Sequence, residues 1–130
     1  MSAGLIVDTS VWIDFLAGET VPLLEDALAI GSVVVPPVVV AELVSGARTG
    51  AERDHLVSLL EDIEVHPTAR EHWVRVGELR RAMSRAGRPV STPDAHVAQC
   101  ALDRDAPLLS RDRAFPRIAS VVQLRLADPG

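Results

Sequence analysis

The sequence of 130 residues contains no lysine and only one cysteine, Cys100. A single cysteine excludes an internal disulfide, so we expect Cys100 to be a small apolar residue in a reducing cytoplasm. No stretch approaches the roughly 20 apolar residues that a membrane span requires. The start of the chain lacks a basic segment followed by a long apolar run, which is the pattern of a signal peptide. We therefore expect a cytoplasmic protein with no membrane association.

Several catalytic motifs are also missing. The sequence has no Gly-rich phosphate-binding loop, no Gly-x-Ser-x-Gly elbow and no context for a cysteine nucleophile. The four histidines share no metal-ligand spacing; they are His55, His66, His72 and His96. For His96, two residues after Asp94, we expect a solvated or helix-capping side chain.

The net charge of −5 argues against diffuse nucleic-acid binding, but the two halves of the chain differ in charge. Residues 1–65 hold eleven acids and two arginines, whereas residues 66–130 hold seven acids and eleven arginines. The exclusive use of arginine has a simple explanation in a GC-rich genome. Arginine also matches the geometry of phosphate, so the basic half is a candidate phosphate-contacting face.

The composition of the sequence is that of one compact α/β domain, which we assign to residues 1–130. Nearly half of the residues are hydrophobic (48%) and about a quarter are charged (24%). Apolar runs alternate with amphipathic stretches, which predicts a parallel sheet with helices on both faces. We expect strands at 4–7, 33–35, 64–66, 107–110 and 121–124, and helices at 9–16, 21–30, 50–62, 68–86 and from 92 onward.

The segment from Val38 to Val44 fits two structures. Its valines favour a strand, whereas Pro37 and Gly46 suit the first turn and the end of a helix, and we predict a helix. In three other helices we assign the N-terminal caps to Thr9 or Ser10, to Thr68 and to Thr92. The inward-facing residues that we expect in the first and the longest helices are Trp12, Ile13 and Leu16, and Trp73, Val76, Leu79 and Met83.

Four acidic residues stand where they can meet. Asp8 and Asp112 follow apolar strands directly, Asp94 opens a helix, and Glu42 lies within an otherwise apolar helix. Each has an ordinary explanation when it is taken alone, for example Asp94 as a helix-terminus charge. In open α/β sheets, however, ligands bind at the carboxyl ends of the strands, where all four are expected.

Four carboxylates in one place require a cation. At a separation of about 5 Å and an effective dielectric near 20, each pair repels by roughly 3 kcal/mol. Oxygen ligands without a Cys–His pattern favour Mg²⁺ or Mn²⁺ over zinc. An acidic cluster that holds such an ion on an α/β sheet fits metal-assisted phosphodiester hydrolysis.

Four stretches of the sequence, in order and from end to end, resemble the PIN-domain ribonucleases, and among them the small VapC-type toxins of toxin–antitoxin pairs. The stretches are 6–12 with Asp8, 37–43 with Glu42, 92–98 with Asp94, and 108–115 with Asp112. The resemblance implies a three-layer α/β/α domain with a central parallel sheet. One departure is Ala114, which stands where many relatives have a further aspartate, and it bears on a second metal position rather than the first.

The resemblance further implies a Mg²⁺- or Mn²⁺-dependent endoribonuclease that inhibits translation, forms a homodimer and is neutralised by a small cognate antitoxin. It makes Asp8, Glu42, Asp94 and Asp112 the metal-binding acids, with the Ser10 hydroxyl supporting the site. For RNA binding we consider the arginines Arg85, Arg88, Arg111 and Arg113.

Three alternatives use similar features. A receiver-type signalling domain also gathers aspartates around Mg²⁺, but it requires an acidic pair after the first strand and a lysine after the last. A HAD-like phosphatase requires Asp-x-Asp after the first strand, and position 10 is Ser10. A PIN fold that only binds its target remains as a third alternative, against which the presence of all four acids argues.

Overall fold

The described residues, 4–128 of this computed structural model, contain a five-stranded sheet in which all paired strands run parallel. The strand order is β3-β2-β1-β4-β5, so the first strand of the chain lies at the centre of the sheet. There Ile6 pairs with Val34 on one side and with Leu108 on the other. The strands are β1 (Leu5–Val7), β2 (Val33–Val35), β3 (Glu64–Val65), β4 (Leu108–Leu109) and β5 (Leu126–Ala127).

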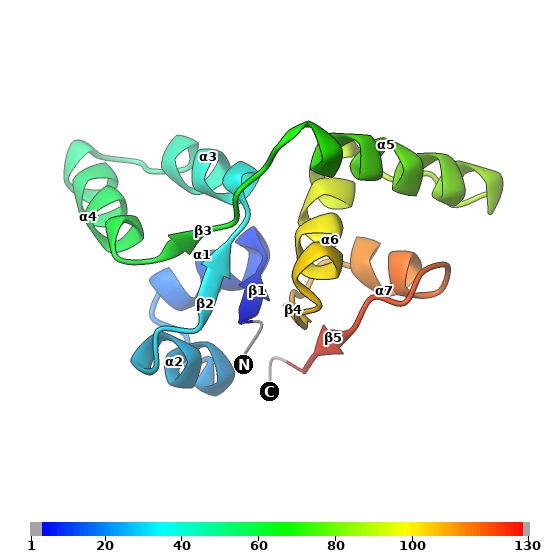
Figure 1. Ribbon diagram of the computed structural model, residues 1–130. Helices are drawn as coiled ribbons and strands as arrows, with labels where there is room; N and C mark the ends of the chain where they lie inside the picture. Colours follow the sequence, from blue (N-terminus) through cyan, green and yellow to red (C-terminus); the bar gives the residue numbers. More distant parts are fainter. Residues whose placement is uncertain (1–3, 129–130) are drawn as a thin grey trace.

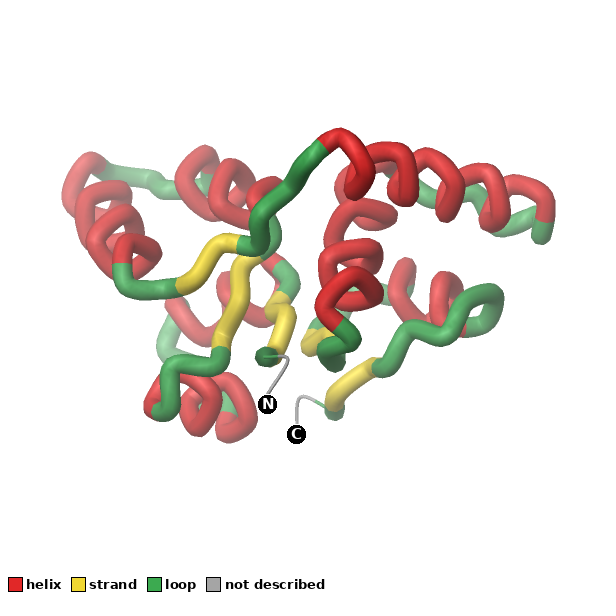
Figure 2. The backbone as a smooth tube through the Cα atoms, viewed as in Figure 1, coloured by secondary structure: helices red, strands yellow, loops and turns green. Residues whose placement is uncertain are grey.

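Helices surround the strands (Figures 1 and 2), and α6 lies at the centre of their packing, in contact with β1, α3, α5 and α7. The three-layer α/β/α arrangement with a central parallel sheet, predicted from the sequence, is confirmed. No helix within residues 4–128 is long and apolar enough to cross a membrane. The helices are α1 (Thr9–Leu16), α2 (Pro22–Ala29), α3 (Pro37–Ser45), α4 (Gly50–Glu61), α5 (Arg70–Arg85), α6 (Thr92–Arg104) and α7 (Ala114–Ala119).

The entry into β1 depends on a glycine. Gly4 has φ +93°, and a Cβ at this position would lie 2.9 Å from both the Ser32 carbonyl oxygen and a methyl group of Val34. Only glycine adopts this conformation at so close an approach without strain. The chain can therefore enter the sheet beside β2 and deliver Asp8 to the carboxyl end of the central strand.

The ambiguous valine segment is helical, as predicted. Pro37 occupies the first turn of α3, where an N–H would have no partner within the helix. Gly46 follows as the C-terminal cap and donates to the carbonyls of Glu42 and Leu43. The β-branched propensity is overridden because Val39 and Leu43, four residues apart, both bury their side chains in the core.

The predicted last strand is wrong. Val121 and Val122 close the end of α7, a short helix that the prediction missed, and both donate to the Ile118 carbonyl at 3.0 Å. The strand lies further along the chain, at β5, and Leu108 of β4 donates to the Arg125 carbonyl beside it. Val121, Val122 and Leu124 pack against the core and do not form a strand.

Three of the predicted caps are also wrong. Asp8 caps α1 by accepting from the Ser10 amide, and Ser91 caps α6 by accepting from the Asp94 amide. Helix α5 follows Ala69 and has no side-chain cap, so Thr68 does not serve as one. In two cases the true cap is one residue earlier than predicted, because a neighbouring hydroxyl obscures it in the sequence.

The inward faces of α1 and α5 are rotated from the prediction. Trp12 is buried, as expected, but Val11 accompanies it, while Ile13 and Leu16 are exposed. In α5 the buried stripe is His72, Val76, Leu79 and Met83, and Trp73 is 45% exposed. The spacing of these four follows the helical period better than the stripe that began at Trp73.

Candidate functional site

Asp8 is a buried carboxylate at the end of the central strand. One of its oxygens, Oδ2, accepts hydrogen bonds from the hydroxyls of Ser10 and Ser110, both at 2.9 Å. The Ser10 amide, at 3.4 Å, approaches the same oxygen. These donors fix the orientation of a side chain whose residue is only 7% exposed.

The loop after β4 is tied to Asp8 through the same two serines. Ser110 Oγ accepts from the Asp112 amide at 3.0 Å, and Ser10 Oγ accepts from the Arg111 amide at 3.1 Å. Asp112 Oδ1 in turn accepts from the Ala114 amide at 2.9 Å. Ser10 was expected at the site and Ser110 was not, although Ser110 directly follows β4 as Asp8 directly follows β1.

Glu42 lies on an exposed face of α3 and reaches across to α1. Its Oε1 accepts a hydrogen bond of 2.8 Å from the Thr9 hydroxyl. Thr9 directly follows Asp8, so this contact holds the α3 carboxylate next to the end of β1.

Asp94 lies in the first turn of α6, and the other three acids affect its pKa. Burial raises the pKa of Asp94, and repulsion from Asp112, Asp8 and Glu42 raises it further, against the lowering effect of Ser91. The four acids identified in the sequence are therefore near enough to interact. A cluster of oxygen donors whose charges repel has the chemistry that Mg²⁺ or Mn²⁺ requires.

The arginines proposed for RNA binding differ in the ion pairs and hydrogen bonds that they form with other side chains. Arg111 Nη1 forms ion pairs with Asp14 and Glu19, at 2.5 and 2.9 Å. Arg88 donates to the Ser120 hydroxyl. Arg85 and Arg113 are exposed, and no ion pair among residues 4–128 includes either of them. Arg113 is thus the unpaired cation next to Asp112.

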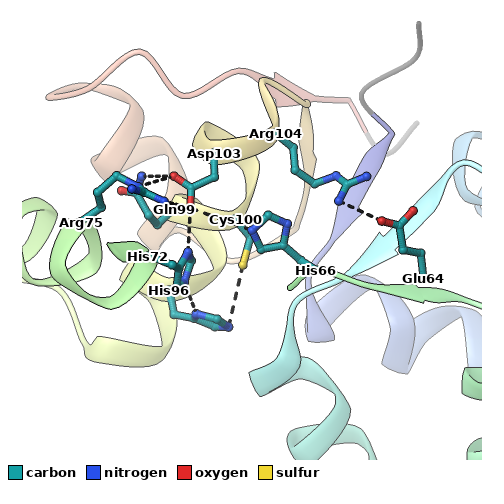
Figure 3. A network of polar contacts seen from close by, with 9 residues as sticks. All are labelled: Glu64, His66, His72, Arg75, His96, Gln99, Cys100, Asp103 and Arg104. Carbon is teal, nitrogen blue, oxygen red and sulfur yellow. Dashed lines mark hydrogen bonds and ion pairs between the residues drawn. The ribbon is translucent and has the colours of Figure 1, made fainter. Parts of the chain in front are cut away.

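A second polar cluster, absent from the sequence predictions, lies between α5 and α6 (Figure 3). His72 Nδ1 is 2.8 Å from Asp103 Oδ2, and His72 Nε2 is 2.8 Å from His96 Nδ1. Asp103 also accepts from Arg75 and Gln99. Burial by itself would raise the pKa of Asp103, but the hydrogen bonds from these three partners lower it to about 2. We call His66, His72, His96, Cys100 and Asp103 the histidine cluster.

The expectation that His96 is solvated or caps a helix is wrong. His96 is 1% exposed and stacks on Trp73, with ring centroids 4.6 Å apart. Burial, with a smaller effect from His72 and His66, lowers the pKa of His96 to about 4. Its Nε2 accepts from the Val38 amide at 3.5 Å, so the neutral ring donates from Nδ1 to His72, and His72 donates to Asp103. The periodic stripe that begins at His72 indicates in the sequence that His72 is buried, but not which residues it meets.

The PIN domain family matches residues 5–121, which is most of the chain, and the protein belongs to this family. No curated protein sequence matches. The fold agrees with the family that the sequence motifs indicated.

Solved structures with a similar fold include several VapBC proteins. VapBC-1 from nontypeable Haemophilus influenzae is 20% identical with a TM-score of 0.77, covering 95% of this chain and 96% of that one. DNA-bound VapBC from Salmonella typhimurium is 21% identical with a TM-score of 0.78 and 98% coverage of both chains. VapBC-5 from Mycobacterium tuberculosis is 24% identical, with a TM-score of 0.68, 95% coverage of this chain and 97% of that chain. At these identities the likeness concerns the fold.

Proposed function

We propose that this protein is a VapC-type toxin, a divalent-metal-dependent endoribonuclease that inhibits translation by cleaving RNA. One observation carries the proposal: burial, and with it repulsion from three other carboxylates, raises the pKa of the half-buried Asp94 in the first turn of α6. Like charges are brought together at such a cost where a cation is to be bound. Membership of the PIN family and the similarity to VapBC structures support the same assignment.

Asp8, Glu42, Asp94 and Asp112 are the residues that would hold Mg²⁺ or Mn²⁺. When bound there, such an ion supplies an activated water and neutralises charge on the phosphate during hydrolysis. The protein's own contribution is to hold the four carboxylates in place before RNA arrives. Preorganised ligands of this kind cost little rearrangement during the reaction.

Three hydroxyls perform this positioning. Ser10 and Ser110 both donate to Asp8 Oδ2, and Ser110 also accepts from the Asp112 amide. Thr9 holds Glu42 from the first turn of α1. We propose Ser10 and Ser110 as the residues that link the two strand ends, and neither needs to contact the metal for this role.

RNA must approach a protein of net charge −5 and a cluster of acids. Local positive charge near the site offsets this repulsion. We propose Arg113 as the main phosphate contact, because it adjoins Asp112 and has no ion pair within the described residues. Arg85 and Arg88 are secondary candidates, whereas Arg111 already pairs with Asp14 and Glu19.

We also propose a cognate antitoxin protein as partner, together with a homodimeric assembly. Similar structures include VapBC proteins and a toxin–antitoxin complex from Klebsiella pneumoniae, which supports a protein partner for this chain. Large apolar side chains on the surface are suited to such contacts, among them Ile30 at 79% exposure and Val74 at 58%.

The test is RNA cleavage by the purified protein with Mg²⁺ or Mn²⁺, and the mapping of RNA ends in cells that express it without an antitoxin. Asp8→Asn should reduce cleavage by at least about 100-fold, since it removes one charged ligand from the metal. Asp26→Asn is the matched control, because Asp26 is an exposed acid on α2, away from the strand ends.

Equal cleavage by both variants would contradict the assignment of the acids. RNA binding without metal-dependent cleavage by the wild type would instead support the binding-only alternative. Protein synthesis measured by amino-acid incorporation in the same cells should fall with the wild type and not with Asp8→Asn.

A further inference from the structure

The histidine cluster holds a set of donors with no part in the carboxylate site. His66 follows β3, His72 lies in the first turn of α5, and Cys100 lies in the middle of α6. Each offers one ligand atom, and these three atoms lie within 4.8 Å of one another. All three residues are buried, and Figure 3 shows their side chains converging between α5, α6 and the segment after β3.

His66 is the unusual member of this set. It is 6% exposed, yet its Nδ1 has no hydrogen-bond partner, and its Nε2 is 3.9 Å from Asp103 Oδ2, beyond hydrogen-bond distance. A buried imidazole nitrogen without a hydrogen-bond partner is costly and calls for an explanation. Burial, reinforced by Arg104 and His72, lowers the pKa of His66, so the ring is neutral and has a lone pair available.

The donor types indicate which metal would bind. Two imidazole nitrogens and a thiolate sulfur suit Zn²⁺, and they are poor ligands for Mg²⁺. Tetrahedral zinc places adjacent nitrogen and sulfur ligands about 3.3 to 3.6 Å apart, so the ligand atoms, now within 4.8 Å of one another, would close by up to roughly 1.5 Å. His66 has the freedom to move because no hydrogen bond holds its ring.

A second set of contacts has the form found around metal-binding histidines. His72 donates from Nδ1 to Asp103, which leaves Nε2 as the ligand atom once it gives up the hydrogen bond from His96. A carboxylate behind the histidine orients the ring and raises its basicity as a ligand. Asp103 is itself fixed by Arg75 and Gln99.

Access to the cluster comes from a pocket at its edge. His66, His72 and Asp103 line this pocket together with Thr68 and Arg75. A metal ion can enter from this side, and a water molecule from the pocket can complete the fourth position. Cys100 lies behind the lining residues, at 0% exposure.

We propose that His66, His72 and Cys100 bind a Zn²⁺ ion, with a water molecule from the pocket as the fourth ligand. Asp103 would orient His72 through its hydrogen bond to Nδ1 and would not contact the metal. On binding, the Cys100 S–H bond breaks, the proton passes to solvent, and the sulfur–zinc bond forms. Burial raises the pKa of the Cys100 thiol to about 12, so zinc must displace this proton. The site links β3, α5 and α6 and is separate from the proposed magnesium site.

Cobalt provides the direct test, because Co²⁺ replaces Zn²⁺ and a cobalt–thiolate bond gives a charge-transfer band in the near ultraviolet. The full-length protein should bind one Co²⁺ with this band, and Zn²⁺ should displace it. Cys100→Ser should abolish the band, and His66→Asn should weaken cobalt binding at least about 10-fold. His55→Asn is the matched control, since His55 is an exposed histidine on α4.

The Asp8→Asn variant separates the two sites. It should keep the cobalt–thiolate band although it loses RNA cleavage, and zinc should still raise its melting temperature. Adding His66→Asn to this variant should remove the zinc-dependent rise. Absence of the band in the wild type, its persistence in Cys100→Ser, or equal affinities of His66→Asn and His55→Asn would overturn the zinc site while leaving the proposed nuclease function untouched.

Discussion

The carboxylates of the carboxylate site and of the histidine cluster have opposite electrostatic surroundings. Among the described residues, no arginine pairs with Asp8, Glu42, Asp94 or Asp112, whose polar contacts are hydroxyls and backbone amides. Asp103 is instead surrounded by Arg75, Gln99 and His72. The charge of Asp103 is neutralised by its neighbours, whereas the four carboxylates repel one another, which is the arrangement we propose for a cation.

The largest expected effect concerns Asp103. Asp103→Ala leaves the buried His72 without its carboxylate partner, and breaking a buried pair of this kind costs about 3 kcal/mol. Asp54→Ala is the control, because Asp54 forms an exposed ion pair with Arg53 and should cost under about 1 kcal/mol. Urea unfolding in metal-free buffer measures both, and equal losses would show that the cluster does not stabilise the fold.

Acid should destabilise the protein through the histidines. The pKa of His96 is about 4 in the native state against 6.5 for an unperturbed imidazole, so the unfolded chain binds the proton first. The free energy of unfolding therefore has its full value above pH 6.5. It falls by on the order of 3 kcal/mol as the pH drops toward 4. The lowered pKa of His66 acts in the same direction, and the raised pKa of Asp94 acts against it.

The urea concentration at the midpoint of unfolding, measured between pH 7.5 and 4, tests this loss of stability. His96→Leu should flatten the curve, while His55→Asn should retain the full slope because His55 is exposed. A wild-type midpoint that is constant over this range would contradict the assignment of a neutral, buried His96.

Divalent cations should stabilise the carboxylate site. Mg²⁺ or Mn²⁺ at about 100 times its dissociation constant adds roughly 2.7 kcal/mol by mass action. Thermal melts with EDTA and with Mn²⁺ measure the difference, which Asp8→Asn should abolish and Asp26→Asn should preserve. Coinciding wild-type melts would mean that the four acids do not bind a cation.

The smallest effect concerns RNA. Arg113→Ala should lower the slope of log affinity against log salt by about 0.7, the value for one phosphate contact on a single strand. Arg111→Ala should change it less, because Arg111 pairs with Asp14 and Glu19. Binding is measured in Ca²⁺ to suppress cleavage, and a larger effect of Arg111→Ala would reverse the assignment.

The positions of the carboxylates could be predicted because they follow from where the strands end. An apolar run that ends in an acid, as at Asp8, marks the carboxyl end of a buried strand, and parallel strands bring such ends to one edge. The α/β sheet followed from the alternation of apolar runs and amphipathic helices, and Pro37 resolved the valine segment. These signals are local, so one sequence suffices to detect them.

The histidine cluster could not be predicted in the same way. His66, His72 and Cys100 meet only because α5 packs on α6 and the segment after β3 joins them, a tertiary arrangement that no spacing reveals. The missed strand has a similar cause. Val121 and Val122 have strand-like side chains, but the contacts they make with Ile118 in α7 depend on packing that the sequence does not display.

The central position of β1 has a consequence for protein synthesis. Asp8 leaves the ribosome first, but its sheet partner β4 and the hydroxyl of Ser110 come about a hundred residues later. Asp112 follows them, beyond all the other acids of the cluster. In a nascent chain the proposed nuclease centre therefore stays incomplete until β4 and the loop with Ser110 and Asp112 have been made and have joined β1.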